Sequence, residues 1–145
     1  MLQKQISVFL ENKRGRLAEI TAVLGAHDID MGALCVADTT DFGILRIIVD
    51  KPDLAARLLK EKGFAVSITE VIAISVEDRP GGLAEALAVF DDCEINIEYI
   101  YHYVRKNEQR ATVILRVENP CEAIKRLLDT RIDLLVDSDL TNARG

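Results

Sequence analysis

Residues 77–85 of the chain read EDRPGGLAE, and residues 11–19 read ENKRGRLAE. A second match follows at the same spacing, because residues 28–31 read DIDM and residues 94–97 read EINI. A third match joins DKP at residues 50–52 to ENP at residues 118–120, with two extra residues in the later copy. Three matches in the same order indicate a duplication. The sequence therefore predicts two repeats, residues 1–70 and residues 71–145.

The hydrophobic pattern predicts the same order of elements in each repeat. A strand with apolar residues at every second position comes first, and an apolar stripe with helical spacing follows the glycine-containing loop. Two further strands are expected at residues 29–37 and 44–50, with counterparts at residues 95–104 and 111–117. A helix that begins near Pro52 or Pro120 and a fourth alternating strand complete each repeat. The positions that set these periods are Ile6, Val8, Leu10, Leu17, Ile20, Leu24, Leu54, Leu58, Leu59, Phe64, Val66 and Ile68, then Ile72, Ile74, Val76, Leu83, Ala86, Leu87, Phe90, Ile124, Leu127, Leu128, Ile132, Leu134 and Val136.

The order β-α-β-β-α-β predicts an α+β fold made of two ferredoxin-like repeats. Right-handed crossovers place the strands of each repeat in the spatial order 4-1-3-2, with both helices on one face of an antiparallel sheet. The second and fourth strands are then edges, and exposed edges invite pairing. We expect the two second strands to pair, which would join the repeats into one eight-stranded sheet.

The second strand of the second repeat, residues 95–104, predicts a further contact. It carries three tyrosines, and both of its faces become apolar towards its end. A strict alternation places Ile95, Ile97, Tyr99, Tyr101 and Tyr103 on one face. Such a strand is either well covered within the chain or packed on a second copy, and the second alternative predicts a homodimer.

Composition excludes several classes of protein. The 145 residues carry a net charge of −6, and the pI is near 4.9. Nucleic-acid binding as the main task needs a cationic face and is not expected. A membrane span needs about 18 consecutive apolar residues, which the sequence lacks, and the first residues lack the cleavage site of a signal peptide. Cys35, Cys93 and Cys121 match no disulfide or metal spacing, so we expect buried thiols and a cytoplasmic location.

A catalytic constellation cannot be assembled from these residues. His27 lies at a predicted helix end, where a cation suits the helix dipole, and His102 lies in the middle of a predicted strand. The carboxylate pairs at residues 91–92 and 137–139 are typical of solvated turns. No HExxH, GxSxG, CxxC or phosphate-loop motif is present. We therefore expect no enzyme activity, no metal and no cofactor.

The loop before the first helix of each repeat is the better candidate for a binding site. Gly15, Gly81 and Gly82 permit close approach of the backbone to a ligand. Backbone N–H groups at a helix N-terminus attract a carboxylate or a phosphate. Three arginines add positive charge beside these loops, namely Arg14, Arg16 and Arg79.

These loops resemble those of the ACT domain. In that family a strand ends in Asx-x-Pro-Gly-x-Leu, and Asn-Ile follows after the helix, as in residues 78–83 and 96–97 of this chain. Residues 12–17 and 30–31 resemble the same motif, with Arg14 in place of the usual Pro and Asp30 in place of the usual Asn. The resemblance covers nearly the whole chain as two tandem copies.

The resemblance implies a function. ACT domains are regulatory modules that usually bind an amino acid between two paired domains. By position, it implies ligand contacts from Asn12, Arg14, Gly15, Arg16, Leu17, Asp30, Met31, Asp78, Pro80, Gly81, Gly82, Leu83 and Asn96. We therefore expect a stand-alone amino-acid sensor, with its ligand between the repeats and a metabolic enzyme as its partner.

Two other functions stay open. The first is an interaction subunit that has lost ligand binding and pairs with an enzyme, an alternative that Arg14 in place of Pro leaves open. The second is a small acyl-phosphate hydrolase on the same topology, with Arg14 binding the anion and Asn12 positioning water.

The two repeats carry their amide and carboxylate in exchanged places. The first repeat has Asn12 in the loop and Asp30 on the strand, whereas the second has Asp78 and Asn96. If the loop of one repeat meets the second strand of the other, one pocket is lined by two amides and the other by two carboxylates. Adjacent carboxylates resist both being charged, so we expect the Asn12–Asn96 pocket to be the better amino-acid site. The alternative is that both aspartates cap turns.

Overall fold

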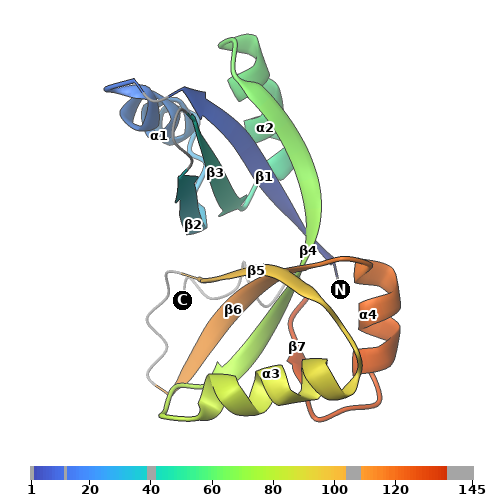
Figure 1. Cartoon of the computed structure of the whole chain (residues 1–145). Coiled ribbons are helices and arrows are strands. Elements are labelled where there is room, and N and C mark those ends of the chain that lie inside the picture. The colour runs from blue at the N-terminus through green and yellow to red at the C-terminus, as the bar shows by residue number, and fades with distance from the viewer. Residues whose placement is uncertain (1, 12, 39–41, 104–108, 137–145) are drawn as a thin grey trace. The chain divides into compact units, whose positions relative to one another are not determined.

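The computed structural model of the chain describes residues 2–11, 13–38, 42–103 and 109–136 (Figure 1). It divides into a first unit of residues 4–69 and a second unit of residues 1–3 together with residues 70–145. The described elements are β1 (Leu2–Glu11), α1 (Arg16–Ala26), β2 (Met31–Asp38), β3 (Phe42–Val49), α2 (Pro52–Glu61), β4 (Ala65–Glu77), α3 (Gly82–Asp92), β5 (Ile97–His102), β6 (Arg110–Val117), α4 (Pro120–Leu127) and β7 (Asp133–Leu134).

The first unit has the predicted strand order, with neighbours β4-β1-β3-β2. Alternate residues of β1, such as Ile6 and Val8, are fully buried because they face both helices. Ile20 of α1 and Leu59 of α2 belong to the same core cluster, which places the two helices on one face of the sheet. Leu17 is an exception to the predicted helical stripe, because it lies in the first turn of α1 and is exposed.

The second unit repeats this arrangement with neighbours β7-β4-β6-β5. Its core joins the later half of β4 and β6 to α3 and α4, through residues such as Ile74, Leu115, Phe90 and Leu127. Leu128 was expected in this core, but it lies at the C-cap of α4 and is exposed. The chain is therefore an α+β protein with two β-α-β-β-α-β units.

Strand β4 merges two strands that the sequence predicts separately. It runs without interruption through thirteen residues, and its first part belongs to the first unit and its second part to the second unit. No Gly or Pro occurs between Ile68 and Ile72 to end one strand and begin the next. Strand β1 is also divided between the two units, because its first residues belong to the second unit. There the side-chain Nε2 of Gln3 donates a hydrogen bond to the Leu135 carbonyl oxygen at 3.4 Å.

The predicted eight-stranded sheet is not confirmed. Seven strands are found in the described part of the chain, because β4 replaces two predicted strands. Strand β2 pairs with β3, and β5 pairs with β6.

A β-bulge changes the faces of the second strands. In β5 the pairing shifts between Ile97 and Tyr99, and Ile97 lies opposite Val117 whereas Tyr99 lies opposite Arg116. The prediction that Ile97 and Tyr99 share one face of a strict alternation is therefore wrong. The same shift occurs in β2 between Met31 and Ala33, so the bulge is a property of both repeats. Tyr103 follows β5, and Val104 lies outside the described residues.

The cysteines depart from the expected burial. Cys121 is exposed near the start of α4, while Cys35 and Cys93 are half-buried. All three thiols are free. His27 lies at the C-cap of α1 as expected, and its Nδ1 lies 2.9 Å from the Val23 carbonyl oxygen.

Candidate functional site

The helices α1 and α3 begin in the same way. Their N-caps are Gly15, with φ of 90°, and Gly81, with φ of 86°. This left-handed conformation is open to glycine at little cost, and it is the reason for a glycine at this position in both repeats. No described side chain caps either helix start. The first N–H group of each helix donates to a loop carbonyl oxygen, and the next N–H groups of the first turn have no intrahelical partner.

Gly82 makes the second loop tighter than the first. A Cβ atom on Gly82 would lie 2.1 Å from the Glu77 carbonyl oxygen, so no larger residue fits without a shift of the backbone. The Gly82 N–H donates to the Arg79 carbonyl oxygen at 3.0 Å. In the first repeat Arg16 occupies the equivalent position, and its N–H lies 3.5 Å from the Lys13 carbonyl oxygen.

The Arg79 guanidinium joins two carboxylates across the second loop. It pairs closely with Glu77 on β4 and also with Glu85 on α3, where the N–O distance is 2.8 Å. The hydrogen bond from Arg79 lowers the pKa of Glu77 below its ordinary value. Arg79 therefore fastens the end of β4 to the first turn of α3.

Two cations pair with carboxylates around the first loop, and of these Arg16 also lies 3.9 Å from Glu11 at the end of β1. Lys13 pairs with Glu11 at 2.9 Å, and its hydrogen bond lowers the pKa of that carboxyl. Arg16 pairs with Glu19 at 3.3 Å. Arg14 is exposed and makes no ion pair with any other residue that the structure describes. A ligand carboxylate can therefore reach Arg14 without breaking an ion pair between residues that the structure describes.

The predicted strand residues lie just before the bulges of β2 and β5. The Asp30 N–H donates to Asp50 Oδ1 at 3.0 Å, and the Asp50 N–H donates to the Asp30 carbonyl oxygen at 3.2 Å. In the second repeat the Glu118 N–H donates to the Asn96 carbonyl oxygen at 3.4 Å. Both side chains belong to exposed residues, so they are accessible to a ligand.

The loop and the strand start of one unit lie at opposite ends of its sheet. Glu11, which precedes the first loop, is opposite Phe42 at the start of β3, whereas Met31 is opposite Val49 at its end. Seven residues of strand separate these positions, or about 23 Å at 3.3 Å per residue. The second unit has the same spacing, with Glu77 opposite Arg110 and Ile97 opposite Val117. One unit alone therefore does not bring the predicted site residues together.

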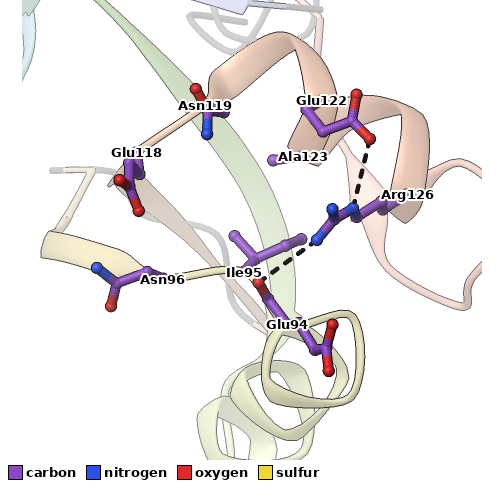
Figure 2. A pocket seen from close by; sticks show the side chains of 8 residues that line it. All are labelled: Glu94, Ile95, Asn96, Glu118, Asn119, Glu122, Ala123 and Arg126. Carbon is purple, nitrogen blue, oxygen red and sulfur yellow. Dashed lines mark hydrogen bonds and ion pairs between the residues drawn. The ribbon is translucent and has the colours of Figure 1, made fainter.

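Asn96 opens onto a small polar pocket in the second unit (Figure 2). The pocket has a volume of about 60 Å³ and lies between the end of α3, the start of β5 and the start of α4. Its lining combines amides, carboxylates and one guanidinium: Glu94, Ile95, Asn96, Glu118, Asn119, Glu122, Ala123 and Arg126. Three carboxylates against one cation make this pocket suited to an ammonium group.

The Arg126 side chain forms part of the wall of this pocket. Figure 2 shows its guanidinium reaching from α4 towards the end of α3, where it donates to the Glu94 carbonyl oxygen at 3.4 Å. It also donates to the Cys93 carbonyl oxygen at 2.9 Å and pairs with Glu122 at 3.5 Å. A cation at the C-terminal carbonyls of a helix is favourable, so Arg126 has a structural reason to hold this position.

The equivalent place in the first unit holds a lysine. Lys51, which aligns with Asn119, donates from its Nζ to the Asp28 carbonyl oxygen at 3.0 Å. Asp28 and Glu94 align as well, and both have φ of 55°. In the first repeat, Lys51 therefore caps the end of α1. In the second repeat, the aligned residue is Asn119, whose amide lines the pocket.

Sequence reasoning placed one residue of this pocket, Asn96, and missed the others. The repeat match at residues 118–120 contains Glu118 and Asn119 but assigned them no binding role, and Arg126 belongs to no motif. The available signal is the repeat itself, because aligning residues 50–52 with residues 118–120 places Asn119 on Lys51. Asn12 lies outside the described residues, so the predicted Asn12–Asn96 pairing stays a prediction. Asp78 is exposed, and its backbone N–H donates to the Gln109 carbonyl oxygen at 2.9 Å.

No cluster of three metal-binding side chains occurs among the residues that the structure describes. Over the same residues, no helix has the length and apolar character needed to cross a membrane.

Comparisons with known proteins identify the family of the chain. The chain matches the family described as an ACT domain pair over residues 1–143. It therefore belongs to the ACT domain pair family, which confirms the resemblance that the two loops indicated. Among curated proteins, no match is found.

Solved structures show the same fold. Protein BT0572 from Bacteroides thetaiotaomicron is 46% identical, with a TM-score of 0.89 over 97% of this chain and 96% of that one. The regulatory subunit of aspartate kinase from Thermus thermophilus, in its ligand-free form, is 18% identical, with a TM-score of 0.62 over 88% of this chain and 92% of that one. The corresponding subunit from Thermus flavus is 16% identical, with a TM-score of 0.61 over the same shares.

Proposed function

We propose that the chain is a regulatory protein that binds a free amino acid. The ligand carboxylate lies at the uncapped start of α1 or α3, where N–H groups and Arg14 attract an anion. The ligand ammonium lies at the start of β5 or β2, where Asn96 and neighbouring carboxylates accept hydrogen bonds. Because these two places are at opposite ends of one sheet, the site combines the loop of one ACT unit with the second strand of another.

The observation that carries this proposal is the pocket at Asn96. It lies beside a strand start that the ACT motif marks, and it is rich in acceptors. The pocket is too small for a whole amino acid, but it is large enough to receive an ammonium group. The second repeat also has the complete Pro-Gly-Gly loop, so we propose that the second repeat contributes more to ligand binding than the first.

A thermal-shift screen against the twenty amino acids tests the proposal. Ligand at 100 times its dissociation constant stabilises the fold by about 2.7 kcal/mol. For a chain of this size the melting temperature then rises by several degrees. Asn96→Ala should remove most of the shift, and Asp30→Ala, at the matched position of the first repeat, should remove less. Full shifts with Asn96→Ala would contradict the assignment of the strand site.

A second function is favoured by the apolar residues on the second strands. Leu34 and Val36 of β2 and Ile100 of β5 are large and exposed. Exposed apolar edges favour pairing with another chain, either a second copy or a metabolic enzyme. Flat thermal-shift curves for every amino acid, together with a stable oligomer, would favour an interaction subunit. Incubation with acyl phosphates tests the hydrolase alternative directly, and we expect no turnover.

A further inference from the structure

A larger cavity lies in the first unit, away from Asp30 and Asn96. Its volume is about 310 Å³, within the range of about 300–1,000 Å³ that is usual for small-molecule pockets. It lies where β1 ends and where β3 and β4 begin. Its lining residues are Phe9, Glu11, Arg16, Phe42, Lys62, Gly63, Phe64 and Ala65.

Three aromatic side chains contribute to the wall of this cavity, beside three charged ones. Three of the four phenylalanines of the chain line it, although the chain is poor in aromatic residues. The rings of Phe9 and Phe42 lie 4.9 Å apart between centroids, and the two residues are 46% and 44% exposed. Exposed phenylalanines that are held together in a concave surface offer a ligand ring the stacked and edge contacts that aromatic pairs prefer.

The charges of the rim favour an anion. Glu11 is paired with Lys13 at 2.9 Å and lies 3.9 Å from Arg16, so its negative charge is partly offset. Lys62 makes no ion pair with another residue in the described parts of the chain. Its ammonium group is thus available to a ligand carboxylate at the edge of the aromatic wall.

The second unit provides an internal comparison. At the equivalent positions Phe9 is replaced by Ser75 and Phe42 by Arg110, and the cavity there has a volume of about 220 Å³. Arg110 donates from its Nε to Ser75 Oγ at 2.6 Å. Arg110 also lies 3.7 Å from Asp133, so its charge is partly compensated. The same place in the fold is therefore polar in the second repeat and aromatic in the first.

We propose that the cavity of the first unit binds a small aromatic carboxylate, with its ring against Phe9, Phe42 and Phe64 and its carboxylate at Lys62. This site shares Arg16 with the start of α1 but lies away from Asn96, so it goes beyond the proposed amino-acid site and is tested independently of Asn96. An aromatic amino acid and an aromatic acid without an amino group share this chemistry. Because Glu11 is already paired, an amino group on the ligand should add little to its affinity. The dissociation constants of the aromatic amino acid and of the aromatic acid should therefore lie within about threefold of each other.

Titrations of the full chain with 3-phenylpropionate and L-phenylalanine, followed by NMR and calorimetry, test this proposal. Both should shift the backbone amide signals of Gly63 and Ala65. Phenethylamine has the ring but no carboxylate, and hexanoate has the carboxylate but no ring, so both should bind at least about tenfold more weakly than 3-phenylpropionate. Equal binding of phenethylamine, or no amide shift with about 10 mM 3-phenylpropionate, would overturn the proposal.

Four variants separate the contributions. Phe42→Ala should weaken binding of 3-phenylpropionate by about tenfold or more, and Lys62→Ala by about fivefold. Lys60→Ala, which removes an exposed lysine of α2 outside the cavity lining, should leave affinity unchanged. Thermal unfolding without ligand checks that each variant is folded. Asn96→Ala should leave 3-phenylpropionate binding intact, whereas a loss would place the ligand at the other site and contradict the proposal.

Discussion

The α-carbon of Gly82 lies so close to the backbone of Glu77 that a Cβ atom would fall 2.1 Å from the Glu77 carbonyl oxygen. This approach brings the end of β4 against the first residue of α3. It explains why the second loop has two successive glycines, one for the left-handed N-cap and one for the close contact. The shape of the loop is thus fixed by backbone packing before any ligand arrives.

Gly82→Ala should therefore destabilise the fold by about 2 kcal/mol, the size expected for local backbone strain. The matched control is Gly25→Ala in α1, where a Cβ would meet nothing within 4 Å. That control should stabilise the fold by about 0.5–1 kcal/mol, because alanine loses less conformational freedom in a helix. Denaturant unfolding measures both values. Equal stabilities for Gly82→Ala and wild type would show that the contact is not tight.

The Arg79 ion pairs should make the second loop sensitive to acid. Glu77 has a lowered pKa in the folded state, so its contribution to stability is complete above the ordinary value of 4.5. The contribution is lost as the pH falls through the lowered value. Melting temperatures from about pH 7 to about pH 3 should therefore fall less steeply for Glu77→Gln than for wild type. Arg79→Met should flatten the profile in the same way, and an unchanged profile for both variants would contradict this role.

Of the two exchanges between positions 51 and 119, only the one at position 119 should weaken ligand binding. Asn119→Lys places an ammonium group where Lys51 reaches a carbonyl oxygen in the first repeat, and it should weaken amino-acid binding by about tenfold. The matched variant Lys51→Asn removes the bond to Asp28 and should not weaken binding. Calorimetry with the amino acid that gives the largest thermal shift measures both. Unchanged affinity in Asn119→Lys would exclude the Asn96 pocket from the site.

A charge on the second strands should disrupt association. Val36→Lys and Ile100→Lys place a lysine on exposed apolar positions of β2 and β5, which discourages strand pairing. Sedimentation velocity at micromolar concentration should show an oligomer for wild type and a smaller species for at least one variant. Glu61→Lys, on the exposed end of α2, should sediment like wild type. A wild-type monomer of 16.1 kDa would contradict the proposed dimer.

Hydrophobic periodicity predicted most of this fold. Ile6 and Val8 alternate, and Ile20 and Leu24 repeat with helical spacing, because buried faces impose these periods on the sequence. The sequence also predicted the position of the loops, because the left-handed N-caps favour the glycines that the two repeats share. Strand order came from the handedness of crossovers rather than from any single residue.

Other features depended on contacts that no local pattern records. The bulge after Ile97 reverses the faces of β5. The sequence did not predict it, because one extra residue in a strand leaves no signature in the hydrophobic alternation. Strand β4 is continuous because no turn signal interrupts it. This strand was predicted as two because the repeat boundary falls within it. The pocket at Asn96 depends on Arg126, a residue of α4 that reaches the end of α3 only in the folded chain.

The most direct test of amino-acid binding is an NMR titration of the isotopically labelled chain with each amino acid. Binding at the ACT site should give saturable shifts in the amide signals of Gly81, Gly82 and Asn96. Shifts confined to Gly63 and Ala65 would report the aromatic cavity alone and would contradict the ACT site as the place of binding. No shift at any of these residues with about 10 mM of every amino acid would contradict the account that this ACT domain pair is an amino-acid sensor.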